Sequence, residues 1–389
     1  MTDPTVSNRV AEIEPQQIRR LFDLAAAHDG DDVVHLEVGE PDFRTPDHVV
    51  EAAATAARDG ETNYTANAGI APLREAIADR LRGRDVAADA DRVVVTTGGV
   101  EALYLTLLTV TDPGDEVVVP TPAWPNPLSQ TELAGATPVE VALPADEGFA
   151  FDADRVVDAV TDRTGAVVLT SPSNPTGRVF DTDEMERVVE AAADHDAVVV
   201  ADEVYHELVY EGSQPSLAAV TDHPERVVTV DSCSKTYAMT GWRVGWLSGP
   251  EAVTAAVTKI HESTTSCVNT PAQYAALAAL TGPEAPVREM KAAFERRRDL
   301  FVERMGEIPG VSMARPEGAF YAFVDVSDLP GTSMDVAERL LYEYDVVAAP
   351  GSAFGDAGEG YLRFSFANDG ARIETGLARF EEMVRAETT

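Results

Sequence analysis

Residues 166–201 read AVVLTSPSNPTGRVFDTDEMERVVEAAADHDAVVVA, and this stretch contains one complete unit of the fold that we predict. It opens with the short run Ala166–Thr170 and closes with a second run, Ala197–Ala201. Both runs are apolar almost throughout, as strands covered on both faces are. The residues 183–194 between them have the pattern of a helix and follow Asp181. A strand, a helix and a strand in this order predict two parallel strands joined by a crossover.

The same alternation continues on both sides of this stretch. Five further short apolar runs are predicted as buried strands: Arg92–Thr96, Glu116–Val119, Val139–Leu143, Val227–Val230 and Val244–Ser248. A helix is expected at Val100–Val110, directly after Gly98 and Gly99. Together these elements predict an α/β fold with a mostly parallel, seven-stranded sheet between helices.

The pattern changes after about residue 290. A long charged helix is expected at Lys291–Met305, followed by strands at Ala319–Val326, near Val346–Ala349, and at Tyr361–Phe366. This arrangement is typical of a smaller α+β domain, and 389 residues are enough for two cores. We therefore expect a large domain over residues 46–289 and a small C-terminal domain over residues 290–389. Residues 1–45 are expected to pack with the small domain.

The composition is strongly acidic. Sixty-seven Asp and Glu residues stand against 30 Lys and Arg residues, and the net charge of −37 is spread along the chain. Phosphate binding requires a basic surface, so this charge argues against nucleic acid and anionic membranes as partners. Lys235, Lys259 and Lys291 are the only lysines. A dispersed acidic surface with few lysines suits a cytoplasm of very high salt, so we favour a halophilic host over an ordinary acidic protein.

Other bulk features indicate a cytoplasmic protein. The two cysteines, Cys233 and Cys267, are too few for a disulfide framework. No run of about 18 apolar residues occurs, and the first 15 residues do not resemble a secretory signal.

The ends of the predicted strands carry the polar residues, and ligands of open α/β sheets bind at these carboxyl ends. Gly98 and Gly99 precede a helix, where free backbone N–H groups and the helix dipole attract anions. Such glycines are also common in ordinary turns, and Val100 excludes a P-loop lysine at this place. Asn174 lies in the rigid turn Ser171–Gly177, which has two prolines and is alternatively a simple turn. Asp202 directly follows an apolar strand and is either a helix cap or a site residue.

The densest group of polar residues follows the strand Val227–Val230. Ser232, Ser234 and Lys235 come within five residues of its end, and Arg243 follows eight residues later. A lysine can form a Schiff base with an aldehyde, while arginine and serine suit a phosphate dianion. A lysine kept here, in a chain with only three, is not explained as a solubility charge.

Taken together, these residues resemble the motifs of the class I and II aminotransferases, which are fold-type-I enzymes dependent on pyridoxal 5'-phosphate (PLP). The matching stretches are Asn174–Gly177, Asp202–Tyr205 and Ser232–Gly245, together with Gly39–Phe43, Pro350–Gly355 and Tyr361–Ser365. The resemblance spans nearly the whole chain. Its pattern is similar to that of archaeal aspartate and aromatic aminotransferases.

The resemblance implies a role for each matching residue. Lys235 is expected to bind PLP and to act as acid and base, and Asp202 to keep the pyridine nitrogen protonated. Tyr205 and Asn174 are expected to form hydrogen bonds with the phenolic oxygen of PLP. The phosphate ligands are expected to be Ser232, Ser234, Arg243, the N–H groups near Gly99 and Val100, and Tyr64 from a neighbouring subunit. Trp124 is expected to stack on the ring. Arg363, with Gly39 and Asn174, is expected to bind the substrate α-carboxylate.

Simpler explanations exist for some of these residues. Trp124 and Tyr64 are also suited to a core or an interface, and Arg363 to an ion pair on a strand surface. Cys233 is expected to be a small buried apolar residue. His206 has no metal-ligand spacing to another His or Cys, so no metal site is expected.

The substrate is less well defined. Val100 stands where some related aspartate aminotransferases are expected to have a lysine for the distal carboxylate, so Arg178 or an arginine of a partner subunit are candidates for that task. We expect an L-amino acid, aspartate or an aromatic or neutral one, and a 2-oxo acid, with 2-oxoglutarate as the usual exchange partner. A ping-pong reaction in a homodimer with its site at the interface is implied. The alternatives are a PLP-dependent lyase on the same fold and, more remotely, a non-catalytic PLP-binding regulator.

Overall fold

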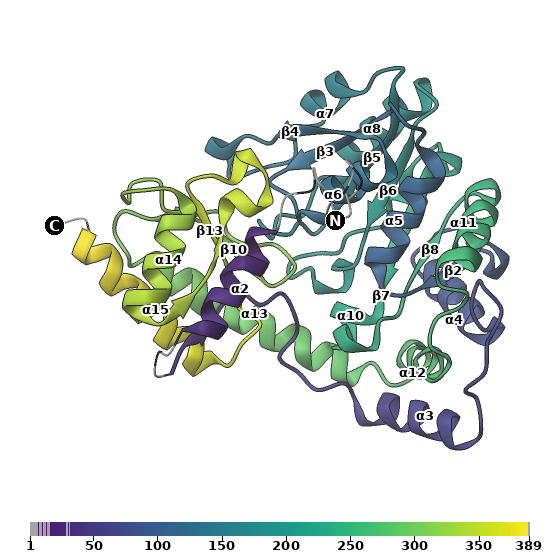
Figure 1. Ribbon diagram of the computed structural model, residues 1–389, viewed down its shortest axis with the longest axis horizontal. Helices are drawn as coiled ribbons and strands as arrows, with labels where there is room; N and C mark the ends of the chain where they lie inside the picture. Colours follow the sequence, from purple (N-terminus) through teal and green to yellow (C-terminus); the bar gives the residue numbers. More distant parts are fainter. Residues whose placement is uncertain are drawn as a thin grey trace, which may run out of the picture.

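The computed structural model describes residues 7, 10, 13, 16–28, 30 and 32–387 (Figure 1). The largest sheet of this part of the chain has seven strands in the order β2-β8-β7-β6-β5-β3-β4. Their bounds are β2 Val93–Thr96, β3 Glu116–Thr121, β4 Thr137–Ala142, β5 Thr164–Thr170, β6 Val198–Asp202, β7 Val227–Ser232 and β8 Gly245–Ser248. Only β8 is antiparallel to its neighbours, so the predicted mostly parallel seven-stranded sheet is confirmed.

Helices cover both faces of this sheet. Val117 and Val200 contribute to a core shared with α5 and α11, whereas Val118 and Val199 contribute to a core shared with α7 and α8. Neighbouring residues of one strand thus point into different cores, which explains why these strands are apolar throughout. The helices of this region are α3 Asp47–Arg58, α4 Ala71–Arg82, α5 Gly99–Val110, α6 Asn126–Ala134, α7 Ala153–Ala159, α8 Thr182–Asp194, α9 Leu217–Val220, α10 Cys233–Thr236, α11 Glu251–Thr264 and α12 Thr270–Thr281.

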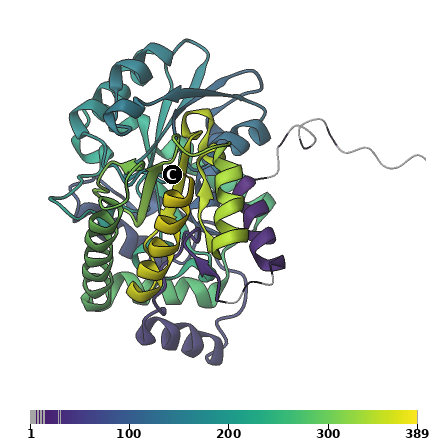
Figure 2. The ribbon, with the colours of Figure 1, turned by 90° about the vertical axis from the view of Figure 1, so that its left-hand side faces the viewer.

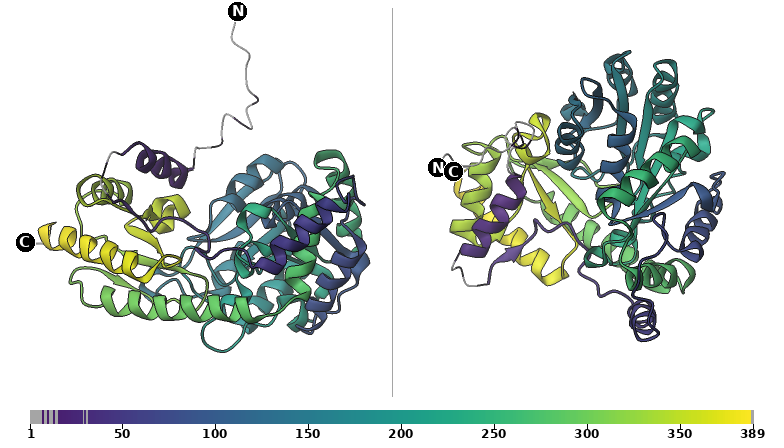
Figure 3. Two further views of the ribbon diagram at one scale, coloured as in Figure 1. Left: turned by 90° about the horizontal axis from the view of Figure 1, so that it is seen from below. Right: turned by 45° about the vertical axis from the view of Figure 1, so that its right-hand side comes forward.

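The C-terminal part is built around two smaller sheets. A four-stranded sheet has the order β12-β13-β10-β9, with β9 Ser312–Met313, β10 Tyr321–Asp325, β12 Ala349–Pro350 and β13 Tyr361–Ser365. A two-stranded sheet joins β1 Val34–His35 to β11 Val346–Val347. The helices here are α2 Gln17–Ala27, α13 Ala285–Met305, α14 Ser333–Tyr344 and α15 Gly370–Glu387. From below, α13 runs along one side of the molecule from this part toward the large sheet (Figure 3).

One predicted strand of this part is wrong in detail. The run Val346–Ala349 was expected as a single strand, but it divides into β11 and β12, which lie in different sheets. β11 pairs with β1, and β12 pairs with β13. The chain therefore changes partner within four residues, which periodicity within so short a run cannot reveal.

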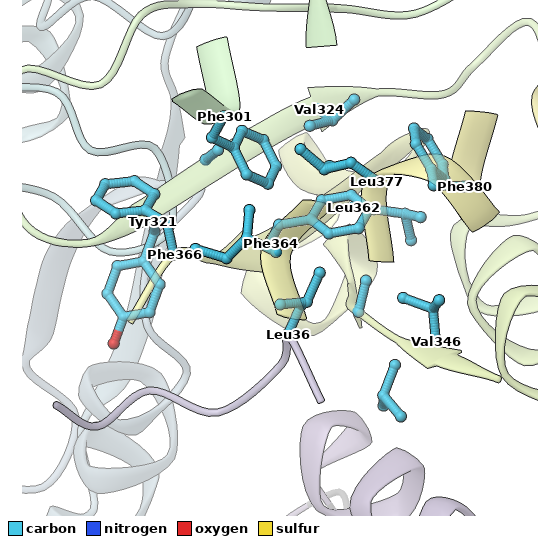
Figure 4. Close-up of a cluster of buried hydrophobic side chains, with 14 of the residues drawn as sticks. Leu36, Phe301, Tyr321, Val324, Val346, Leu362, Phe364, Phe366, Leu377 and Phe380 are labelled. Atoms are coloured by element: carbon cyan, nitrogen blue, oxygen red, sulfur yellow. The ribbon is translucent and has the colours of Figure 1, made fainter. Parts of the chain in front are cut away.

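The N-terminal segment lies against the C-terminal part, as Figures 1 and 2 show for the purple helix α2 beside α14. Leu21 of α2 and Leu36 after β1 belong to the same buried cluster as Phe364 and Phe380. Tyr321 lies at the edge of this cluster, and its hydroxyl oxygen points away from the other labelled side chains (Figure 4). The N-terminal segment and the C-terminal part thus build one core, in which Tyr321 of β10 meets Tyr205, which follows β6 of the large sheet.

No helix in residues 16–28 or 32–387 is long and apolar enough to cross a membrane.

Candidate active site

A cavity of about 420 Å³ lies at the carboxyl ends of β5, β6 and β7 and beside the N-terminus of α5. Its size is within the range usual for small-molecule sites. Of the thirteen residues predicted for the site, twelve line it: Gly39, Gly99, Val100, Trp124, Asn174, Asp202, Tyr205, Ser232, Ser234, Lys235, Arg243 and Arg363. Tyr64 does not line the cavity of its own chain, and its side chain is 89% exposed.

Lys235 stands on the short helix α10, which begins directly after β7. The side chain of Ser232 caps this helix by accepting a hydrogen bond from the backbone N–H of Ser234 at 3.2 Å. The Nζ of Lys235 donates a hydrogen bond to the carbonyl oxygen of Gly39. Burial, and after it the charge of Arg363, lowers the pKa of Lys235 to about 8. Its amine is therefore much closer to the neutral, nucleophilic form than that of an exposed lysine.

Asp202 is the buried last residue of β6. Its carboxylate accepts hydrogen bonds only at long range, from the Thr170 hydroxyl at 3.5 Å and the Val204 N–H at 3.4 Å. Burial raises the pKa of Asp202 to about 7, and the nearby acid Asp231 adds to the effect. No lysine, arginine or histidine of the described chain forms an ion pair with it. A buried carboxylate in this state is poised to accept a cationic hydrogen-bond donor.

Arg363 is a buried guanidinium without a carboxylate partner in the part of the chain that the structure describes. Its Nη1 donates to Asn174 Oδ1 at 3.0 Å and its Nη2 donates to the Glu37 carbonyl oxygen. Its Cζ lies 4.5 Å from the ring centre of Tyr321 and 4.9 Å from that of Phe354. Burial lowers the pKa of Arg363, and its Nε has no hydrogen-bond partner within residues 32–387. The ion-pair alternative for Arg363 therefore does not hold, and the group suits an incoming carboxylate.

Two tyrosines, Tyr205 and Tyr321, line the cavity together with Asp202 and Arg363. The hydroxyl of Tyr205 is 2.9 Å from that of Tyr321, and their rings meet edge to face. Tyr205 follows the end of β6, and Tyr321 opens β10 of the smaller sheet. The hydroxyl pair thus joins the two sheets at the cavity wall.

The turn between β2 and α5 has the geometry of an anion site. Gly98 has a φ of 83°, and a Cβ built on it would lie 2.5 Å from Nη2 of Arg243. Only glycine allows this close approach without strain. Arg243 donates to the carbonyl oxygens of Thr240 and Thr97, at 2.8 Å and 3.3 Å, and has no acidic partner within residues 32–387. Its charge adds to the positive end of the α5 dipole at Gly99.

Comparisons with known proteins agree with this geometry. Residues 31–380 match the model of the family described as aminotransferase class I and II. The chain is 39% identical to a probable aspartate aminotransferase of Methanocaldococcus jannaschii, over 97% of this chain and 99% of that protein. It is 37% identical to an aromatic-amino-acid aminotransferase of Thermococcus litoralis, over 98% of each chain. A double mutant of the aspartate aminotransferase of Thermus thermophilus superposes with a TM-score of 0.93 at 39% identity, over 97% of this chain and 99% of that one.

The chain belongs to this family. The class I and II aminotransferases are PLP-dependent enzymes, so the predicted fold, cofactor and reaction class are confirmed. The cavity of this family member fits PLP, because it offers an amine for an aldehyde, a buried acid for a pyridinium and an anion site for a phosphate.

The sequence did not reveal several groups of this aminotransferase site. Tyr321 and the Glu37 carbonyl orient Arg363, and Ile18, Arg19 and Phe22 of α2 line the cavity. Tyrosine and phenylalanine at such positions are normally core or surface residues, so no chemical signal marked them.

One expected alternative is not supported by the geometry. Arg178, a candidate for binding a distal carboxylate, pairs with Glu317 at 3.4 Å and does not line the cavity.

Proposed function

We propose that this aminotransferase exchanges amino groups between an L-amino acid, aspartate or an aromatic or neutral one, and a 2-oxo acid by a ping-pong reaction. 2-Oxoglutarate is the proposed exchange partner. The observation that carries the proposal is the shared cavity of Lys235, Asp202 and Arg363, each buried or half-buried and none with an ion-pair partner among the described residues. These are the groups needed to hold a carbonyl cofactor and an α-carboxylate at the same time.

The cofactor would be held at three points. Lys235 would bind its aldehyde carbon, Asp202 its ring nitrogen, and Tyr205 and Asn174 its phenolic oxygen. The phosphate would be bound by Ser232, Ser234, Arg243 and the N–H groups of Gly99 and Val100, and Trp124 would stack on the ring. Bound PLP supplies an electron sink for the Cα carbon of the substrate.

The chain's own residues then bind and deprotonate the substrate. Arg363, fixed by Asn174 and the Glu37 carbonyl, would clamp the α-carboxylate, with the N–H of Gly39 assisting. Lys235, with its lowered pKa, would move the proton at Cα once its amine is free. Asp202 would keep the ring nitrogen protonated, because a cationic donor compensates the cost of its buried charge.

Tyr64 supports the proposal of a homodimer with the active site at the interface. It is the most exposed of the large apolar side chains within the described residues, and it lies outside its own cavity. A second subunit that received this tyrosine at its phosphate site would bury it. The cytoplasmic location and the halophilic host likewise remain proposals, supported by the composition. The domain division at residues 45 and 289 also remains a proposal, and the cluster that unites Leu21 with Phe364 supports the packing of the N-terminal segment with the small domain.

A labelling experiment tests the proposal. Borohydride reduction of the loaded enzyme should fix the cofactor to the chain, and peptide mapping should find it on Lys235. Lys235→Ala should lose the label and reduce transamination by at least about 10³-fold, whereas Lys259→Ala, which removes an exposed lysine of α11, should keep both. An amino acid added alone should yield one 2-oxo acid per subunit without ammonia. Release of ammonia would indicate the lyase instead, and a label elsewhere would refute the role of Lys235.

A further inference from the structure

One part of the cavity wall is apolar and comes from two helices. Ile18 and Phe22 stand on α2, and Val100 and Leu103 stand on the first turns of α5. Ile18 packs against the buried cluster that contains Phe354, whose ring also lies 4.9 Å from Cζ of Arg363. The apolar wall therefore adjoins the place where the α-carboxylate is proposed to bind.

Phe22 distinguishes this wall from an ordinary packed surface. Its side chain is 41% exposed, and it is the one residue among the exposed large apolar side chains of the described chain that lines the cavity. The others, which include Tyr64 and Tyr342, lie outside it. A ligand side chain of matching character would cover Phe22 and remove its ring from water.

The charges of the cavity leave little for a second carboxylate. Its cations are Lys235, Arg243, Arg363 and Arg19. The first three are engaged in the proposed binding of cofactor and α-carboxylate. Arg19 pairs with Asp23 at 3.2 Å, and both side chains are mostly exposed, at 71% and 63%. Its guanidinium also lies over the Phe22 ring, with 5.1 Å between Cζ and the ring centre.

The acidic residues of the cavity also disfavour a second carboxylate on the substrate. Glu37, Glu40 and Asp202 line it, and Glu40 accepts a hydrogen bond from Thr240 at 3.0 Å. A distal carboxylate would leave water for an apolar wall and meet these acids. Among the described residues of its own chain, the one cavity cation left for it is the solvated Arg19. Burying a charge without a partner is unfavourable, whereas burying an apolar side chain is favourable.

We propose that α2 and α5 form a subsite for the substrate side chain that accepts aromatic and large aliphatic groups, with Phe22 as its specificity-determining residue. This inference rests on the proposed function and names the class of its amino donor. Phenylalanine and leucine are better donors than aspartate, and the side chain of the donor lies against Ile18, Phe22, Val100 and Leu103.

The test compares donors in the first half-reaction of the PLP-loaded enzyme, measured as 2-oxo acid released per subunit. We expect kcat/KM for phenylalanine to exceed that for aspartate at least about tenfold. Phe22→Ala should lower the phenylalanine-to-alanine ratio of kcat/KM about tenfold. Tyr342→Ala, which truncates an exposed aromatic outside the cavity, should leave that ratio within about twofold of the original. Phe22→Arg should raise the aspartate-to-phenylalanine ratio about tenfold, because it brings a cation to the wall.

The outcomes separate this inference from the proposed function. A preference of the unaltered enzyme for aspartate, or an unchanged ratio in Phe22→Ala, would overturn the apolar subsite and leave the transaminase intact. A failure of alanine, phenylalanine and aspartate alike to yield any 2-oxo acid would instead reject the proposed function.

Discussion

Two buried aspartates lie at or next to the ends of neighbouring strands of the large sheet, and their surroundings differ. Asp202 ends β6 and lines the large cavity, whereas Asp231 lies near the end of β7 and lines a much smaller hollow with Arg80, Arg84 and His206. In the sheet, Asp202 pairs with Val230. Successive side chains of a strand point to opposite faces, so Asp231 lies on the other side of the sheet from Asp202.

The two carboxylates are compensated differently. Asp231 accepts a hydrogen bond from the Ser232 N–H at 2.6 Å and lies 3.4 Å from Nδ1 of His206. Burial raises its pKa to about 6, while His206 and Arg84 counteract part of that rise. Asp202, without such cations among the described residues, has a pKa of about 7. The protein thus satisfies one buried acid from within and leaves the other for the cofactor.

The largest effect is expected on kcat, which should depend strongly on Asp202 and only weakly on Asp231. Asp202→Ala should reduce kcat of the PLP-loaded enzyme by about 10²–10³-fold, because the ring nitrogen loses the acid that keeps it protonated. Asp231→Ala, the matched truncation on the other face, should reduce kcat less than about tenfold. Steady-state transamination at saturating cofactor measures both. Equal losses would mean that the face of the sheet does not determine the role of these acids.

The free energy of unfolding should depend more on Asp231 than on Asp202, which is the reverse of the order expected for activity. Asp231→Ala should lower the free energy of unfolding of the cofactor-free protein by about 1–3 kcal/mol, because it removes the acceptor of the Ser232 N–H and the acid 3.4 Å from half-buried His206. Urea titration at pH 7 measures the change, and the additional truncation of His206 should restore part of it. A stability equal to that of the unaltered protein would show that the pair on this face is not structural.

Much of this division could be predicted from the sequence. The strands, and the acids, lysine and glycines at their ends, were predicted because short apolar runs and polar residues mark a parallel sheet. The side of the sheet on which Asp231 lies could not be predicted. Residues 227–232 are buried on both faces and show no alternation, so only the pairing with β6 fixes the direction of each side chain.

The contribution of α2 and β10 to the cavity was also beyond sequence reasoning. Phe22 lies in an amphipathic pattern that is typical of any surface helix, and Tyr321 lies in an apolar run that is typical of any buried strand. Neither pattern indicates a binding site. Their positions depend on the packing of the N-terminal segment against the C-terminal part, a contact between residues far apart in the chain. Arg363 was predicted through its resemblance to a motif, but its lack of an acidic partner appears only in three dimensions.

The raised pKa of Asp202 should make the stability of the cofactor-free protein depend on pH. Its pKa is about 7 in the folded protein and 3.8 ordinarily, so ionisation disfavours the folded state. The stability contributed by this group is fully present below pH 4 and is lost as the pH rises through 7. Asp202→Asn should therefore stabilise the cofactor-free protein at pH 8 by about 2 kcal/mol and have little effect at pH 4.

Thermal unfolding of both proteins across this pH range checks the prediction. Saturating PLP is the control, because it supplies a cationic donor to Asp202 and should stabilise the unaltered protein more than Asp202→Asn. A stability difference between the two that does not depend on pH would show that the charge of Asp202 is not its cause.

The smallest effect distinguishes these buried acids from the many acids on the surface. Self-repulsion of a net charge of −37 is screened by salt, so raising KCl from about 0.1 M to about 2 M should raise the Tm by at least about 3 °C. The difference in Tm between the unaltered protein and Asp202→Asn at pH 8 should stay nearly constant, because salt screens a buried charge much less. Calorimetry at both salt concentrations measures the two quantities. If salt removed the effect of Asp202→Asn but left the Tm of the unaltered protein unchanged, the destabilising acid would lie within reach of solvent ions, and the contrast between the two faces of the sheet would no longer explain the site.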